Sequence, residues 1–196
     1  ERGIDVYALL EEKSAAVAPG ANGILPIFSD VMNCGAWYHA APSLLNLSLD
    51  ASVCGKPQIF RAIQENAAIV ASENLQLAAN LAGVTLTDLV FAGGASKGAL
   101  WGQILSDVTG LPVKVPEVTE ATALAAGLAA WVGIGEYASL PEAADAVVRW
   151  RRRYEPDASR HSLYREVAER WREAYAAQRR LVDAGITRSM WKAPGL

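Results

Sequence analysis

An apolar run that ends in two consecutive glycines constrains the fold of this chain more than any other feature. Residues 89–92 read Leu-Val-Phe-Ala, Gly93 and Gly94 follow, and an amphipathic helical pattern comes next. This order predicts a buried strand, a tight turn and a helix. Glycine lets a ligand approach the backbone, and the start of a helix offers unpaired N–H groups and partial positive charge. The junction is a candidate nucleotide site, although an ordinary strand-to-helix turn fits the same residues.

Five residues form the candidate site. The backbones of Gly93 and Gly94 would lie against the nucleotide, followed by Ala95, Ser96 and Lys97. Ser96 is equally suited to capping the following helix. Lys97 either reaches a phosphate or stays solvated.

The spacing of apolar residues predicts strands that alternate with helices, and therefore an α/β architecture. The expected helices cover residues 3–16, 57–83, 96–110, 120–132, 140–152 and 162–183. The expected strands cover residues 23–28, 43–49, 88–92 and 113–115. The helix over 120–132 has almost no polar face, so we expect it to be buried on nearly all sides.

Composition excludes several kinds of protein. The net charge is −3, which gives no electrostatic case for binding nucleic acid, and the basic run Arg149–Arg153 reads as a solvated helix end. Cys34 and Cys54 match no metal or redox spacing, so we expect two reduced thiols and no metal site. No apolar run approaches the roughly 18 residues that a membrane span needs, and no signal peptide is recognisable. These features indicate a cytoplasmic protein.

The residues after the glycine pair carry a family resemblance. Residues 93–110 read GGASKGALWGQILSDVTG, residues 111–116 read LPVKVP, and residues 117–124 read EVTEATAL. This sequence resembles the C-terminal signature of the FGGY carbohydrate kinases, and the similarity runs from about Pro19 to Tyr137. The resemblance implies a ribonuclease H-like fold of the actin-type ATPases, with a nucleotide-binding domain over 1–139 and a helical extension over 140–196. It also implies ATP and Mg²⁺ as cofactors.

Further segments resemble the autoinducer-2 kinase branch of that family. They are residues 26–30, 37–43, 46–48, 65–70 and 189–196, whereas residues 31–36 lack the Gly-Glu-Arg type of sequence that other branches carry. The resemblance implies phosphorylation of a linear five-carbon polyhydroxy ketone in quorum-sensing signal processing. A pentulose or glycerol-type kinase, and a non-catalytic interaction domain that kept the fold, remain as alternatives.

Other residues are weaker candidates. In the family the position of Asp107 is structural, and Glu120 suits a helix start. His39 and Asp30 both fit a packed or surface role better than substrate contact. Some relatives contact adenine with an Asn four residues after the second glycine, but Gly98 stands there in this sequence. No catalytic residue is therefore assigned.

The chain begins at Glu1 within a helical pattern, so we expect a piece of a longer protein. The resemblance places the catalytic Asp and a glycine-threonine phosphate hairpin upstream, and it places the sugar-like substrate on a missing N-terminal domain. We therefore expect the chain alone to be inactive. We also expect its uncovered sheet to pair with a second copy or a companion chain.

Overall fold

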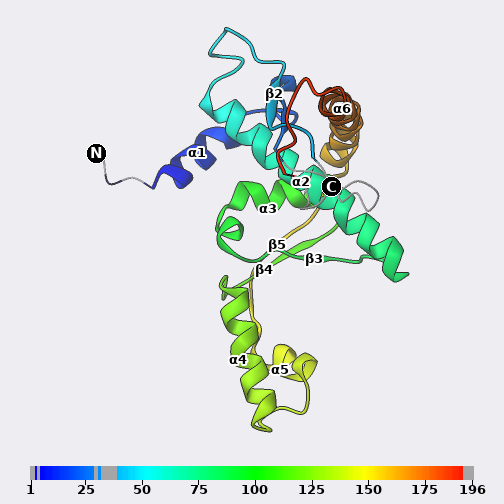
Figure 1. Ribbon diagram of the computed structural model, residues 1–196. Coiled ribbons are helices and arrows are strands. Elements are labelled where there is room, and N and C mark those ends of the chain that lie inside the picture. Colours follow the sequence, from blue (N-terminus) through cyan, green and yellow to red (C-terminus); the bar gives the residue numbers. More distant parts are fainter. Residues whose placement is uncertain (1–2, 4, 29–30, 32–38, 192–196) are drawn as a thin grey trace.

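The computed structural model describes residues 3, 5–28, 31 and 39–191, and these residues form an α/β structure, as predicted (Figure 1). The helices are α1 (Val6–Ala15), α2 (Lys56–Ala82), α3 (Ala99–Thr109), α4 (Ala121–Gly133), α5 (Leu140–Val147) and α6 (Ala158–Asp183). The strands are β1 (Leu25–Ile27), β2 (Ser43–Leu45), β3 (Leu89–Val90), β4 (Val113–Pro116) and β5 (Trp150–Tyr154). Two short 3₁₀ helices, η1 (Ala21–Gly23) and η2 (Gly94–Lys97), complete the described elements.

The strands form two small sheets. β1 and β2 pair antiparallel, whereas β4 lies in the middle of a second sheet, parallel to β3 and antiparallel to β5. α2 and α3 pack against each other, and α6 packs against α3. This arrangement places the loop between β3 and α3 beside the segment that follows β4.

The main hydrophobic core lies where α2, α3 and α6 meet. Apolar side chains recur every three or four residues along the last helix, a spacing that predicts one buried stripe, and Tyr164, Val167, Trp171 and Tyr175 of that stripe all lie in the core. The Trp171 indole N–H donates to the carbonyl of Pro26 at 2.9 Å, so the same side chain also holds β1. Periodic spacing in the sequence thus identified the correct face of α6.

α2 buries a polar cluster that its apolar spacing did not predict. One carboxylate oxygen of Glu65 accepts hydrogen bonds from Arg61 Nε at 2.8 Å, from the Tyr164 hydroxyl at 2.8 Å and from Gly20 N at 3.1 Å. Arg61 also donates to Tyr164 and to the carbonyl of Ser14. The cluster joins α1, α2 and α6, and these partners are what makes burial of the two charges tolerable.

Two predicted elements end four or more residues earlier than expected. The strand predicted over 43–49 stops at Leu45 because Asn46 adopts a left-handed backbone (φ 61°) and donates from its side chain to Gly23. Leu47 and Leu49 are exposed as a result. The helix predicted over 140–152 stops at Val147, because Val148 is extended, and the basic run becomes β5 on the edge of the sheet.

The prediction that residues 120–132 are buried on nearly all sides was wrong. Figure 1 shows α4 and α5 projecting away from the other helices, and Leu128 is the buried residue of α4. Among the described residues α5 is the main element that packs against α4, so most of the apolar side chains of α4 stay exposed.

Candidate nucleotide site

The turn after β3 is held in place by backbone hydrogen bonds. Phe91 N donates to the carbonyl of Lys114 at 2.8 Å, and Gly93 N donates to the carbonyl of Thr119 at 2.8 Å. Gly93 has φ 84° and ψ −176°, a conformation that is essentially restricted to glycine. The backbone conformation of the turn is therefore sufficient to explain why residue 93 is a glycine.

Gly94 has neither of the usual structural reasons for being a glycine. Its φ is not positive, and a Cβ added to it would meet no atom of the described residues within 4 Å. The side of the loop at Gly94 is thus open, and a ligand can reach the backbone there. Gly94 and Ala95 also begin η2, and the first N–H groups of a helix have no partner within that helix.

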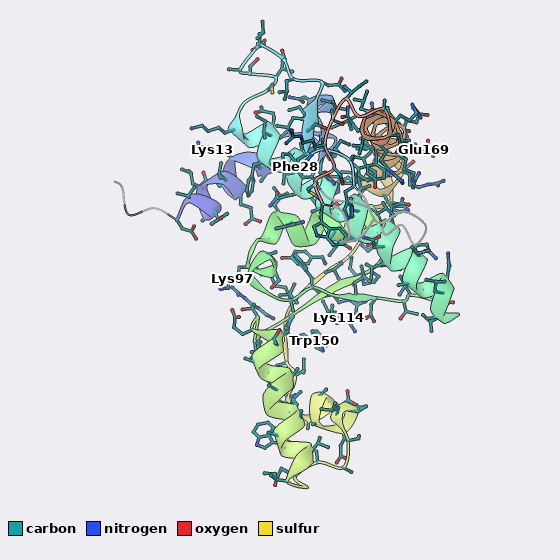
Figure 2. The ribbon with its side chains drawn as sticks, in the orientation of Figure 1. Lys13, Phe28, Lys97, Lys114, Trp150 and Glu169 are labelled. Atoms are coloured by element: carbon teal, nitrogen blue, oxygen red, sulfur yellow. The ribbon has the colours of Figure 1, made fainter. Side chains whose placement is uncertain are left out.

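Ser96 does not cap the following helix, contrary to the sequence prediction. Its Oγ donates to the carbonyl of Gly93 at 2.7 Å, and the side chain is buried inside the loop. The residue that precedes α3 is Gly98, which has no side chain to offer as a cap. Lys97 is exposed and extends from the loop into solvent (Figure 2), as a solvated lysine would.

The cap of α3 comes instead from α1. The carboxylate of Glu11 accepts a hydrogen bond from Leu100 N at 3.1 Å, across 89 positions of sequence. Glu11 was not predicted from the sequence, because no local motif connects residues so far apart. The available signal was Gly98 itself, since a bare residue at a helix N-cap leaves N–H groups for another side chain to satisfy.

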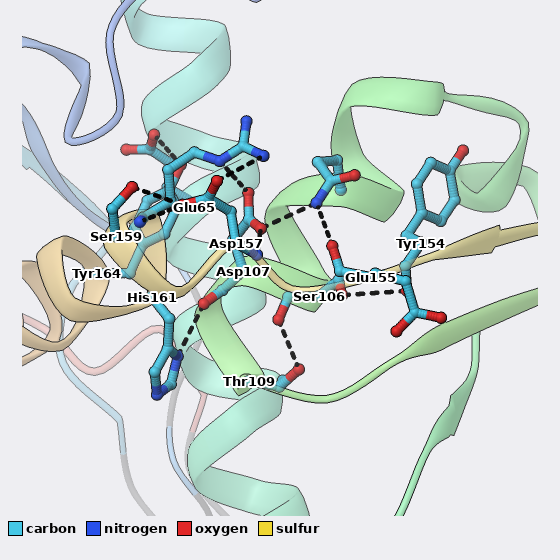
Figure 3. Close-up of polar contacts among 12 residues, drawn as sticks. Glu65, Ser106, Asp107, Thr109, Tyr154, Glu155, Asp157, Ser159, His161 and Tyr164 are labelled. Carbon is cyan, nitrogen blue, oxygen red and sulfur yellow. Dashed lines mark hydrogen bonds and ion pairs between the residues drawn. The ribbon is translucent and has the colours of Figure 1, made fainter.

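Asp107 holds α3 and the start of α6 together (Figure 3). Its side chain accepts from Gln103 Nε2 and from Asp157 N, both at 2.9 Å, and forms an ion pair with Arg160 at 3.0 Å. The Asp107 backbone carbonyl also lies 2.9 Å from Nδ1 of His161. These contacts join α3 to the start of α6, which agrees with a structural role.

Of the other weaker candidates, His39 and Glu120 lie within the described residues, and Glu120 follows Thr119, whose carbonyl accepts from Gly93 N. His39 donates its backbone N–H to Ser189, and its ring lies 5.7 Å from that of Trp191, so it is packed. Glu120 directly precedes α4 and is exposed. Asp30 and Cys34 lie outside the described residues, and Cys54 is a free thiol.

Two apolar hollows border β3. One, of about 380 Å³, lies between the sheet and the pair α4–α5, and it is lined by Val90, Ala92, Leu124, Leu128, Val148 and Trp150 among others. The other, of about 530 Å³, lies between α2 and β3, and its lining includes Ala71, Leu75, Phe91 and Trp101. Both flank the strand that leads into the glycine pair.

No cluster of three or more His, Cys, Asp or Glu suited to a metal ion occurs among the described residues. Within the same part of the chain, no helix combines the length and apolarity needed to cross a membrane.

Curated relatives resemble the whole chain closely. It is 55% identical over 194 residues to "Autoinducer-2 kinase" of Salmonella typhimurium (strain LT2), and 53% identical to the protein of that name from Yersinia enterocolitica. Each match covers 99% of this chain and 37% of the relative, so the chain spans little more than a third of their length.

Solved structures show the same fold at low identity. A xylulose kinase from Rhodospirillum rubrum superposes with a TM-score of 0.73 at 18% identity, over 93% of this chain and 36% of that one. A glycerol kinase from Plasmodium falciparum, solved with ADP, gives 0.69 at 18% identity, over 88% of this chain and 34% of that one. The predicted actin-type ATPase fold is thereby confirmed.

The family resemblance read from the sequence is confirmed as well. A family model described as "FGGY family of carbohydrate kinases, C-terminal domain" matches residues 2–133, most of the chain and all of the glycine loop. The chain belongs to the FGGY family of carbohydrate kinases.

Proposed function

We propose that this chain is the nucleotide-binding part of a kinase that transfers a phosphoryl group from ATP to the autoinducer-2 precursor, a linear five-carbon polyhydroxy ketone. The structural observation that carries the proposal is Gly94, a glycine that neither backbone conformation nor packing explains. The substrate is proposed from the 55% identity to the Salmonella relative named for that activity. An ATP-dependent kinase of this kind would act in the cytoplasm, where ATP is available.

The loop would hold the phosphates through its backbone. The first N–H groups of η2, at Gly94 and Ala95, would point at phosphate oxygens, and Lys97 would add a mobile positive charge. Mg²⁺ offsets phosphate charge in such reactions. We propose that Mg²⁺ arrives with ATP and is held mainly by its phosphates.

The proposal assigns no general base to this chain. Asp107 is buried, and its carboxylate is already engaged by Gln103, Asp157 and Arg160. We propose that the base and the sugar-like substrate's site belong to the part of the full-length kinase beyond the third that this chain spans. The chain alone should then bind ATP weakly and phosphorylate nothing.

Replacing Gly94 tests the site. In the full-length kinase, Gly94→Val should raise the KM for ATP at least tenfold and leave the KM for the sugar-like substrate unchanged, because a branched side chain would fill the open space. Lys97→Ala should have a smaller effect, since a flexible, exposed point charge is replaceable. An unchanged KM for ATP in a folded Gly94→Val protein would show that the loop is only a turn.

One observation favours a second role for the same chain, as an interaction domain. The apolar side chains of α4 and its surroundings are exposed, with Trp131 at 42% and Ile134 at 79%, and β3 borders two hollows. We propose that the remainder of the kinase, a second copy or a companion chain covers this surface. Nucleotide binding separates the roles, because a purely interacting domain would not need the open loop.

A further inference from the structure

The entrance of α3 is built from two distant parts of the chain. Gly98 occupies the N-cap and offers no side chain, while Glu11 reaches across from α1 and accepts the hydrogen bond of Leu100 N at 3.1 Å. An N-cap side chain normally makes this contact within its own helix. The negative carboxylate also lies at the positive end of the helix, where it is electrostatically favoured.

Gly98 leaves room for that carboxylate because it has no side chain. A Cβ added to Gly98 would lie 3.0 Å from Cδ of Glu11 and closer still to its Oε1. The backbone of Gly98 has φ −78°, which any residue adopts, so packing against Glu11 explains the glycine and conformation does not. The two residues are therefore a matched pair.

The last turn of α1 is itself anchored to the core. Ser14 is fully buried, and its Oγ donates to the carbonyl of Pro57 at 3.0 Å. Its backbone carbonyl accepts from Arg61, a member of the buried cluster on α2. Glu11 lies one turn before Ser14 on α1, so its carboxylate projects from a fixed support.

We infer that Glu11 is a positioning residue for the nucleotide loop, an inference that rests on the proposed function. By fixing the first turn of α3, Glu11 fixes the C-terminal end of the loop that runs through Gly93, Gly94 and η2. Its carboxylate also fills the place that an anion would take at the N-terminus of α3. Nucleotide phosphates would then meet the N–H groups of η2, one step earlier in the chain.

Substitutions at Glu11 test the inference in the full-length kinase. Glu11→Ala should raise the KM for ATP about fivefold, the size of one lost helix cap, with kcat and the KM for the sugar-like substrate unchanged. Glu11→Gln should recover most of the loss, because its amide oxygen still accepts from Leu100 N. Glu12→Ala, at the exposed neighbouring position of the same helix, is the matched control and should change neither constant.

Hydrogen exchange at the Leu100 amide tests the Glu11 cap of α3 in the absence of nucleotide. In the nucleotide-free protein, Glu11→Ala should speed hydrogen exchange at the Leu100 amide at least tenfold, and Glu12→Ala should not. Gly98→Ala should disturb the loop on its own, but much less when Glu11→Ala removes the clashing carboxylate.

The outcomes separate the inference from the proposed function. If the wild-type kinase binds no ATP, the proposed function fails and the positioning role falls with it, while amide exchange still reports the cap. If ATP binds and Glu11→Ala matches Glu12→Ala in the KM for ATP, the positioning inference is overturned, even where exchange at Leu100 increases.

Discussion

Replacing Glu65 by leucine should destabilise the protein more than any surface change, because it strands a buried positive charge. Arg61 and Glu65 are 5% and 3% exposed, and one Glu65 oxygen accepts three hydrogen bonds. Removing one partner of a buried ion pair costs about 3–5 kcal/mol. In a chain of this size that lowers the melting temperature by about 6–20 °C.

The loss of stability in Glu65→Leu should come from leaving the Arg61 charge buried and unpaired rather than from losing a strong attraction. Burial raises the pKa of Glu65 against the opposing effect of Arg61, which shows that taking the carboxylate out of water is itself expensive. The triple variant Arg61→Met/Glu65→Leu/Tyr164→Phe removes every charged or hydroxyl member of the cluster at once. It should be more stable than Glu65→Leu by at least about 1 kcal/mol, although Gly20 N loses its acceptor.

Urea unfolding followed by tryptophan fluorescence measures both differences. The matched control is Glu73→Leu, on the same helix and also paired with an arginine of α6, but with the Arg172 side chain 51% exposed. It should cost less than about 1 kcal/mol. The reasoning is refuted if Glu65→Leu costs no more than the control, or if the triple variant is the least stable of the three.

Three further predictions follow from particular contacts. Burial, and then the charge of Glu65, raise the pKa of Tyr164 above its ordinary value of 10.0, so folded Tyr164 keeps its proton where the unfolded chain has lost it. Its contribution to stability should be complete below pH 10 and should fall by up to about 1.4 kcal/mol per pH unit above it, a slope that Tyr164→Phe should lack in alkaline urea titrations. Gly102→Ala should cost about 1–3 kcal/mol in urea unfolding, because its Cβ would lie 2.8 Å from Cζ of Tyr154; a neutral effect would mean that β5 shifts easily. The isolated chain should self-associate or bind a hydrophobic dye through α4, and Trp131→Glu with Ile134→Glu should weaken this in sedimentation; a dye-free wild-type monomer at high concentration would contradict the idea.

Sequence reasoning succeeded where the cause is local. Gly83 and Gly110 were expected to end their helices, and both adopt left-handed conformations there, with φ 66° and 69°. A glycine at this position avoids the strain that a Cβ would bring. Periodicity likewise found the buried face of α6, because one helix face must meet the core whatever else surrounds it.

Prediction from the sequence failed where pairing with a distant element decides which secondary structure forms. The run around Arg149–Arg153 was interpreted as a solvated helix end, yet it forms β5. The strand exists because β4 offers it an antiparallel partner, and Lys114 on β4 lies 5.1 Å from the ring of Trp150 (Figure 2). Three consecutive arginines between Trp150 and Tyr154 are compatible with either element, so only the partner strand decides which one forms.

The burial prediction for α4 was wrong for a related reason. Its near-continuous apolar composition was taken to mean burial within this chain, but most of its residues are exposed and Leu128 is its buried residue. Composition indicates that a surface needs cover, but it does not indicate which polypeptide supplies the cover. Because the chain spans 37% of its curated relatives, the same apolar pattern that misled the burial prediction supports a partner surface.

The six residues from Gly93 to Gly98 contain three glycines, and each is a glycine for a different reason. The sequence alone could not distinguish these reasons. Gly93 is needed for its backbone conformation, and Gly98 for the space that the Glu11 carboxylate occupies. Substitution at either residue disturbs the fold of the loop before any ligand binds, so loss of ATP binding there would be ambiguous. Gly94 has an ordinary backbone and no neighbour among the described residues. A side chain added at Gly94 should therefore leave the loop folded and affect only nucleotide binding. Gly94→Val should then raise the KM for ATP without lowering the stability of the protein.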